Sequence, residues 1–228
     1  MSSFQIKVLA IVLMVVDHIG LFFFPNLIIL RIIGRLSFPL FAFLIANGAI
    51  YTKNINAYLR RLFIFACISQ IPFYFANNTI GLFGYVNVLF TLFLGLFAIK
   101  IIKETKDKRI WFLAVLFSCF FAIIFKTDYQ AQGVLSIVLF YLFFNNLRFM
   151  VLSQILLSFI CSTIVLIFNS YSSLQPIPLL PFYFNALGLF SLIFISFYNK
   201  KEGKKAKYLF YIFYPVQYVI IFLLKILF

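Results

Sequence analysis

The sequence is poor in acidic residues, histidine and cysteine. Of its 228 residues, five are Asp or Glu, one is His and three are Cys. The cysteines, Cys67, Cys119 and Cys161, all fall inside apolar stretches, and none has metal-ligand spacing or a nearby histidine. This pattern argues against a zinc-type metal site, so we predict no metal and interpret the cysteines as packing residues.

The chain also lacks the polar surface of a soluble domain. Hydrophobic residues make up 65% of it and aromatic residues 21%, whereas soluble domains average about 45–50% apolar residues. One globular core cannot bury this excess, so we predict an all-α, polytopic transmembrane helix bundle. We find no internal repeat or coiled coil and expect a single domain over 1–228. No signal-peptide cleavage site is evident, so we expect the first apolar stretch to be a retained span.

Nine apolar segments are candidate membrane spans, because a spanning helix needs about 20 mostly apolar residues. They are residues 6–24, 32–51, 58–76, 82–102, 110–125, 134–147, 149–168, 181–198 and 207–228. The number nine is odd, so the two ends of the chain are expected on opposite sides of the membrane.

The basic residues occupy every second loop between these segments. Lysine and arginine cluster at 53–61, 100–109, 148 and 200–207, the last group ending at Lys207, while loops 77–81 and 169–180 are nearly uncharged. The positive-inside rule then predicts an inner N-terminus and an outer C-terminus. The same distribution explains the net charge of +14. It favours membrane lipids as partners of the lysines and argues against nucleic acid.

Ionisable residues inside the apolar segments are the candidates for chemistry. Asp17 and His18, the only histidine, lie within 6–24, and Arg31 and Arg35 lie one helical turn apart beside the next segment. A charged side chain in hydrocarbon costs a few kcal/mol or more and usually faces a bundle interior or a wet cavity. Asp17 and an arginine could form a structural ion pair, or all four residues could form a catalytic site in the outer half of the membrane.

The expected catalytic roles follow from the residue types. Histidine is the natural general base near neutral pH, so we expect His18 to deprotonate an acceptor. Adjacent side chains on a helix do not face each other, so either Asp17 or Asp128 could orient the imidazole. Arg31 or Arg35 could stabilise an oxyanion.

Asp128 belongs to the connector 126–133, which we expect to dip into the membrane. The preceding segment, 110–125, would be only about 24 Å long as a helix, against about 30 Å of hydrocarbon. Irregular backbone at that depth is tolerated only where it lines a cavity or is buried in protein. Gln70 and Asn87 are predicted on the same side of the membrane.

An anionic cofactor would need cations on the inner side and polar groups along the spans. The candidates are Lys53, Arg60, Arg61, Asn87, Thr91, Tyr211 and Tyr214. Alternative interpretations stay open for each kind of residue. The cations could orient the protein or attract anionic lipids, Asn and Thr could join helices by hydrogen bonds, and the tyrosines could form an interfacial belt.

Read in order, several short motifs resemble the TraX family of membrane acetyltransferases. They are DHIG (17–20), RIIGRLSFPLF (31–41), NG (47–48), TKN (52–54), YLRRL (58–62), SQIP (69–72), NVLFTL (87–92), DY with GVL (128–135) and FYIFYP (210–215). The family also resembles, more distantly, the membrane acyltransferases that decorate surface sugars.

The resemblance implies an enzyme of the plasma (cytoplasmic) membrane that transfers acetyl from acetyl-CoA to an amine or hydroxyl. The acceptor would be a protein N-terminus, as on pilin, or a surface glycan. One position departs from the family, which tends to have a histidine two residues after the Tyr-Pro of the last span, where this chain has Gln217. The narrow pilin activity is therefore less expected than the general class.

Two other functions stay open from the residues alone. A small transporter or flippase could use Arg31 and Arg35 as an anion site, since intramembrane charges mark substrate paths in carriers. The missing inverted repeat and the odd number of spans weigh against it. A non-catalytic membrane scaffold would be compatible with Gln217.

Overall fold

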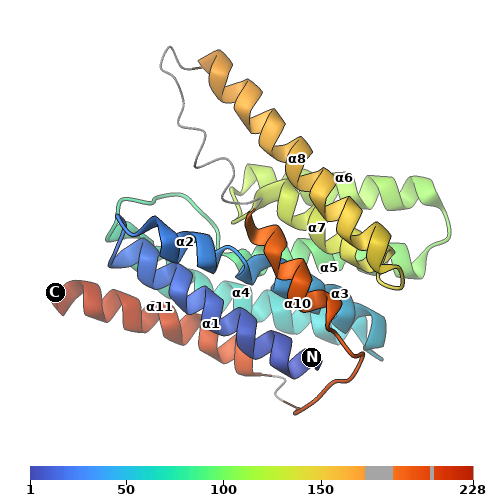
Figure 1. The fold of residues 1–228 in the computed structure, drawn as a ribbon, viewed down its shortest axis with the longest axis horizontal. Helices are drawn as coiled ribbons and strands as arrows, with labels where there is room; N and C mark the ends of the chain where they lie inside the picture. Colours follow the sequence, from blue (N-terminus) through green and yellow to red (C-terminus); the bar gives the residue numbers. More distant parts are fainter. Residues whose placement is uncertain (173–186, 206–207, 228) are drawn as a thin grey trace. The chain divides into compact units, whose positions relative to one another are not determined.

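The computed structural model describes residues 1–172, 187–205 and 208–227. Regular structure in these ranges is helical apart from one isolated bridge between Val86 and Thr127 (Figure 1). The all-α prediction is therefore confirmed. Most of the predicted loop 169–180, the start of the predicted span 181–198, and Lys207 lie outside the described residues.

The chain divides into two compact units, Met1–Phe41 with Phe143–Gly203, and Ala42–Leu142 with Lys204–Phe228. The first unit contains α1, α2, the start of α3, α8, η1 and α10. Their bounds are Ser3–Phe22 for α1, Ile28–Gly34 for α2, Ser37–Tyr51 for α3, Leu147–Ser172 for α8, Gly188–Phe190 for η1 and Ser191–Ser196 for α10.

The start of α1 is fixed by short-range hydrogen bonds and by a distant loop. Ser2 and Gln5 form a capping box, in which each side chain accepts a hydrogen bond from the other residue's backbone N–H. The N–H of Ser3 donates to the carbonyl of Lys201 at 2.9 Å, and the N–H of Phe4 donates to that of Glu202 at 3.0 Å. These bonds satisfy donors that a first helical turn otherwise leaves unpaired.

The second unit contains the rest of α3 and five further helices. These are α4 (Ile55–Asn78), α5 (Val88–Glu104), α6 (Lys108–Ile124), α7 (Gln130–Leu142) and α11 (Leu209–Leu227). The side chains of Asn54, Asn87 and Asp107 cap α4, α5 and α6 by accepting from a backbone N–H two or three residues on. Local polar residues thus set where these helices begin.

Side-chain contacts give the directions of the helices in the second unit. Phe65 stacks on Tyr211 with ring centres 5.0 Å apart, and Phe73 meets Tyr218 at 5.2 Å, so α4 and α11 run parallel. The α5 helix runs antiparallel to α4, because Asn87 at its start bonds to Gln70, whereas Phe90 and Phe93, further along α5, contact Phe63, earlier in α4. Successive spans cross a membrane in alternating directions, so the third and ninth should be parallel and the fourth antiparallel to both. The helices α4, α11 and α5 agree with this expectation.

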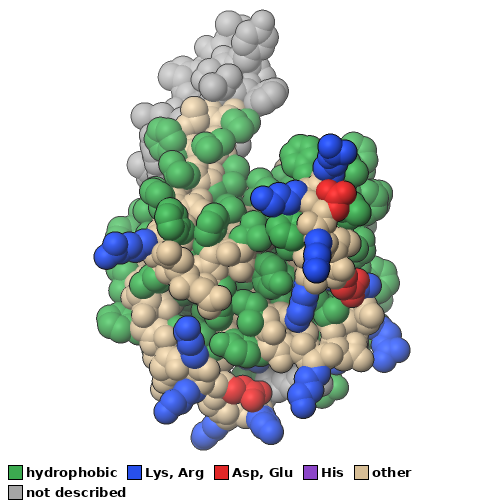
Figure 2. Space-filling model, turned by 90° about the vertical axis from the view of Figure 1, so that its right-hand side faces the viewer, with side chains coloured by type: hydrophobic (Ala, Val, Ile, Leu, Met, Phe, Trp, Pro, Cys, Tyr) green, Lys and Arg blue, Asp and Glu red, His purple; other side chains and the backbone are tan. Residues whose placement is uncertain are grey.

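Five helical stretches are long and apolar enough to cross a membrane. They are Ser3–Phe22, Ile28–Tyr51, Ile55–Asn78, Leu147–Ile164 and Leu209–Leu227. On the face shown in Figure 2, hydrophobic side chains are exposed beside many lysines and arginines, while acidic side chains are scarce. The chain is a membrane protein. Because α5 and α6 have 17 residues and α7 has 13, the count of nine spans and their orientation stay predictions.

Two predicted boundaries differ from the structure. The segment predicted at 82–102 becomes helical only at Val88, since Gly81 and Gly84 both have φ of +75° and Asn87 caps the helix. The apolar residues before Val88 therefore form a loop. The segment predicted at 32–51 begins inside a separate short helix, α2 (Ile28–Gly34), which carries Arg31, and continues as α3 from Ser37.

Candidate functional site

Helices α1 and α2 approach each other at two glycines. A Cβ atom added to Gly34 would lie 2.2 Å from the Cβ of Asp17, and one added to Gly20 would lie 2.8 Å from the Cβ of Leu30. Neither distance is compatible with a side chain, so the two backbones meet directly. A Cβ on Gly188 would likewise lie 2.9 Å from the carbonyl oxygen of Arg35, so η1 closely approaches the C-terminal end of α2.

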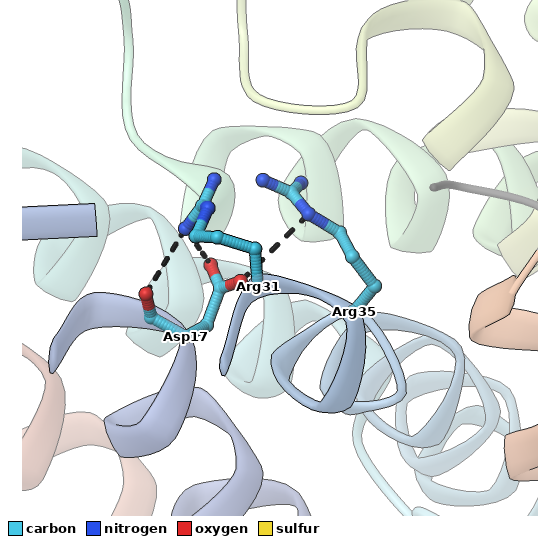
Figure 3. A network of polar contacts seen from close by, with 3 residues as sticks. All are labelled: Asp17, Arg31 and Arg35. Atoms are coloured by element: carbon cyan, nitrogen blue, oxygen red, sulfur yellow. Dashed lines mark hydrogen bonds and ion pairs between the residues drawn. The ribbon is translucent and has the colours of Figure 1, made fainter. Parts of the chain in front are cut away.

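This close packing places the carboxylate of Asp17 between two guanidinium groups (Figure 3). Arg31 Nη1 lies 2.6 Å from Oδ2 of Asp17 and also donates to the backbone carbonyl of Asp17 at 3.0 Å. Arg35 Nε lies 3.7 Å from Oδ1. The side chains are 14% exposed for Asp17 and 19% for each arginine. One carboxylate and two guanidiniums leave the cluster with a formal charge of +1, which suits a developing oxyanion.

His18 is buried, with 8% of its surface exposed, and meets Phe22 edge to face with ring centres 6.3 Å apart. Asp17 is engaged with the arginines, as the structural ion-pair interpretation expected. The carboxylate therefore orients guanidinium groups, and its role of orienting the imidazole stays a prediction. Asp128, the other carboxylate considered for that role, belongs to the second unit.

In the second unit, Asn87 is the centre of a polar network that joins α4 to α5. Its Nδ2 donates to the carbonyl of Ala66 and to Oε1 of Gln70, both at 2.8 Å, and its Oδ1 accepts from the N–H of Leu89 at 3.0 Å. Gln70 in turn donates to the carbonyl of Tyr85 at 3.1 Å. Both amide hydrogens and the oxygen of Asn87 are used inside the protein, which favours a structural role over its predicted contact with a cofactor.

Thr91 forms hydrogen bonds with the connector that contains Asp128. Its hydroxyl lies 3.0 Å from that of Thr127 and also donates to the backbone carbonyl of Asp128. The N–H of Asp128 donates to the carbonyl of Val86 at 3.0 Å. Thr127 is 2% exposed, whereas the side chain of Asp128 is exposed. The connector is therefore fixed against α5 through its backbone and Thr127.

Of the three predicted inner cations, two are exposed and one contacts tyrosine side chains. Lys53 and Arg60 are exposed. Arg61 lies with its Cζ 5.9 Å from the centre of the Tyr58 ring, and the hydroxyl of Tyr211 interacts with its guanidinium. Tyr58 was not among the predicted site residues, although it stands in the YLRRL motif.

Both predicted tyrosines of α11 are buried, with 7% of Tyr211 and 1% of Tyr214 exposed. This burial favours a packing or binding role over an interfacial belt. Tyr214 interacts with the backbone N–H of Val88 and the side chain of Tyr218, and Asp128 acts on it electrostatically. The structure thus brings Arg61 and Tyr211 together, and it places Tyr214 beside the Asn87–Thr91 end of α5.

Comparison with known proteins agrees with the motifs. The model of the family described as TraX protein matches residues 2–225. The chain is 29% identical over 232 residues to a probable fimbrial assembly protein FimC, serogroup H1, of Dichelobacter nodosus, covering 95% of this chain and 92% of that protein. It is 37% identical over 90 residues to an uncharacterized protein of Rickettsia prowazekii (strain Madrid E), covering 40% of this chain and 33% of that protein. No solved structure matches.

Proposed function

Because this chain belongs to the TraX protein family, we propose that it is an acyltransferase of the cytoplasmic membrane. It would move an acetyl group from acetyl-CoA to an amine or hydroxyl, with His18 as the general base. The observation that supports this proposal most is the buried imidazole next in sequence to a carboxylate held between two guanidinium groups. Titratable groups placed together in an apolar region are candidates for catalysis.

In the proposed reaction, the imidazole of His18 takes a proton from the acceptor amine or hydroxyl. The freed nitrogen or oxygen bonds to the thioester carbonyl carbon, whose oxygen becomes an oxyanion. The carbon–sulfur bond then breaks, and CoA leaves as a thiolate that takes the proton back from the imidazolium. Arg31 and Arg35 would stabilise the oxyanion, because Asp17 offsets only one of their two charges.

The acyl donor would bind through the second unit. Arg61, held beside Tyr58 and Tyr211, would contact a phosphate of CoA, since guanidinium groups suit phosphate oxygens. The exposed Lys53 and Arg60 would raise the local concentration of this polyanion. The similarity to a fimbrial assembly protein supports a subunit of a surface fibre as acceptor, ahead of a glycan.

The test is acetyl transfer from labelled acetyl-CoA by the purified protein in nanodiscs. Transfer that falls by about a hundredfold or more in His18→Ala would support the base, in line with the usual contribution of general base catalysis. Undiminished transfer by His18→Ala would reject it. Binding of acetyl-CoA without any turnover would indicate a scaffold.

A transporter is the second candidate, supported by the net positive charge of the Asp17–Arg31–Arg35 cluster within apolar segments. Anion flux in proteoliposomes without acetyl-CoA, lost in Arg35→Gln, would favour it. Absence of flux together with acetyl transfer would favour the enzyme.

A further inference from the structure

Four buried polar atoms on α4 and α11 have no hydrogen-bond partner in the part of the chain that is described. One is Oδ1 of Asn78, the last residue of α4, and the other three belong to residues further inside the two helices. They are Nε of Arg61, Oγ of Ser69 and Oε1 of Gln217. Ser69 is fully buried and Gln217 is 8% exposed. A buried polar atom without a hydrogen bond costs free energy, and more so in a membrane, where water cannot compensate. Each such atom therefore calls for an explanation.

The register of the two helices places these atoms along one contact. Ser69 lies one helical turn from both Phe65 and Phe73, whose rings contact Tyr211 and Tyr218 of α11. Ser69 is therefore on the side of α4 that meets α11, at the level of Tyr214. Arg61 lies eight residues earlier, about 12 Å along the helix. Gln217 follows Tyr214 by three residues on the buried face of α11.

Proline interrupts both helices at this level. Pro72 lies inside α4 and Pro215 inside α11. Proline has no N–H, so the carbonyls of Ile68 and Tyr211, four residues earlier, lose their usual helical donors. These carbonyls add to the acceptors Gln217 Oε1 and Ser69 Oγ on the same two helices. A ligand that suits them supplies N–H or O–H donors.

We propose that the contact between α4 and α11, from Arg61 to Ser69 and Gln217, is the binding track for the pantetheine arm of the acyl donor. This inference rests on the proposed function. A linear ligand with an anionic end and secondary amides further along matches a guanidinium followed, about two helical turns later, by acceptors. Arg61 binds a phosphate, and Ser69 and Gln217 receive the amide groups of the arm.

The test measures binding to the full-length protein in nanodiscs by calorimetry, with two probes. CoA carries the pantetheine arm, and adenosine 3′,5′-bisphosphate is the nucleotide part without it. Ser69→Ala and Gln217→Leu should each weaken CoA binding about 5- to 10-fold, the worth of one hydrogen bond, and leave the nucleotide affinity unchanged. Arg61→Gln should weaken both probes.

Two matched controls separate binding from folding. Ser118 of α6 is also fully buried, and its hydroxyl also has no partner among the described residues, so Ser118→Ala should leave both affinities unchanged. Arg148, an exposed arginine of the first unit, should tolerate Arg148→Gln with less than a twofold effect. Because Ser69→Ala and Gln217→Leu remove polar atoms that bond nothing, their melting temperatures should equal or exceed that of the wild type.

Failure of the binding track and failure of the proposed function give different results. If the wild type binds CoA and transfers acetyl, but Ser69→Ala and Gln217→Leu behave like Ser118→Ala, the track is wrong and the proposed function stands. If the wild type binds no CoA, both are overturned. Equal loss of CoA and nucleotide binding in Ser69→Ala would indicate a general structural role and would also overturn the track.

Discussion

Arg31 holds Asp17 at two atoms, its Nη1 lying 2.6 Å from the carboxylate oxygen Oδ2 and 3.0 Å from the backbone carbonyl oxygen. The second contact does not depend on the side chain at position 17. Arg31 therefore contacts the backbone of helix α1 as well as the carboxylate, whereas the contact of Arg35 with Asp17 is to the carboxylate, 3.7 Å away.

Asp17→Asn should destabilise the protein by about 2–4 kcal/mol, because it removes the negative charge that two largely buried guanidinium groups contact. The 14–19% exposure of these side chains keeps the effect below that of a fully buried pair. Thermal unfolding in detergent measures it.

Lys100→Met is the matched control for this ion pair. It removes a pair with Glu104 at 3.8 Å in which the side chains are 24% and 47% exposed. Exposed pairs of this spacing contribute about 0.3–0.5 kcal/mol. An equal effect of Asp17→Asn and Lys100→Met would contradict the central position given to the Asp17 cluster.

Gly34→Ala should separate α1 from α2. The new methyl group would lie 2.2 Å from the Cβ and 2.4 Å from the Cα of Asp17, so one helix must move and the contacts of Asp17 with both arginines must lengthen. Overpacking of this kind costs about 1–3 kcal/mol, and acetyl transfer should fall with it. Ile33→Ala, on the exposed side of the same helix, should change neither property. Full activity of Gly34→Ala would show that the close approach is dispensable.

The Asp17 pair could be predicted from the sequence, because a lone carboxylate in an apolar run needs a partner and the nearest cations followed in Arg31 and Arg35. The glycines that allow the pair to form could not be assigned in the same way. Gly20 approaches Leu30 and Gly34 approaches Asp17, and both contacts depend on how the chain turns between α1 and α2.

The start of α5 shows why hydropathy misplaced a helix boundary. Residues 82–86 are as apolar as the helix that follows, so composition continues across a loop. The polar residue Asn87 falls inside the predicted segment 82–102, whereas in the structure it is the N-cap of α5. The backbone conformation of the connector around Asp128 was even harder to predict. Its residues Lys126, Tyr129 and Gln130 have φ of +49°, +63° and +41°. These residue types rarely adopt such angles, so nothing in the local sequence indicates them.

Asn87→Asp should destabilise the protein by about 3 kcal/mol. The cap on Leu89 survives, but a carboxylate would face the carbonyl of Ala66 and Oε1 of Gln70, two acceptors now bonded to Nδ2 at 2.8 Å. Lost hydrogen bonds and a buried unpaired charge act in the same direction. Chemical unfolding in detergent gives the free energy.

Asn54→Asp provides the control at a second N-cap. Asn54 is exposed, and its Oδ1 accepts from the N–H of Ala57 at 2.8 Å. Aspartate caps equally well and suits the positive end of a helix. This variant should match or exceed the wild type in stability. Similar stability of Asn87→Asp and Asn54→Asp would refute the interhelical role of Asn87.

Lys103 has a structural role beyond the positive-inside charge it was expected to supply. Its Nζ donates to the carbonyl of Ala49 at 2.9 Å. A side chain of α5 thus provides a hydrogen bond to a carbonyl in the last turn of α3. Lys103→Met keeps the length of the side chain and should cost about 1 kcal/mol, through the lost hydrogen bond and the lost interaction with the helix dipole. Lys106→Met removes an equal charge from an exposed loop position where the described part of the chain offers no partner, and it should leave the melting temperature unchanged. Because both variants reduce the positive charge equally, a larger effect of Lys103→Met on melting separates capping from charge, and identical melting curves would show that the bond to Ala49 contributes nothing.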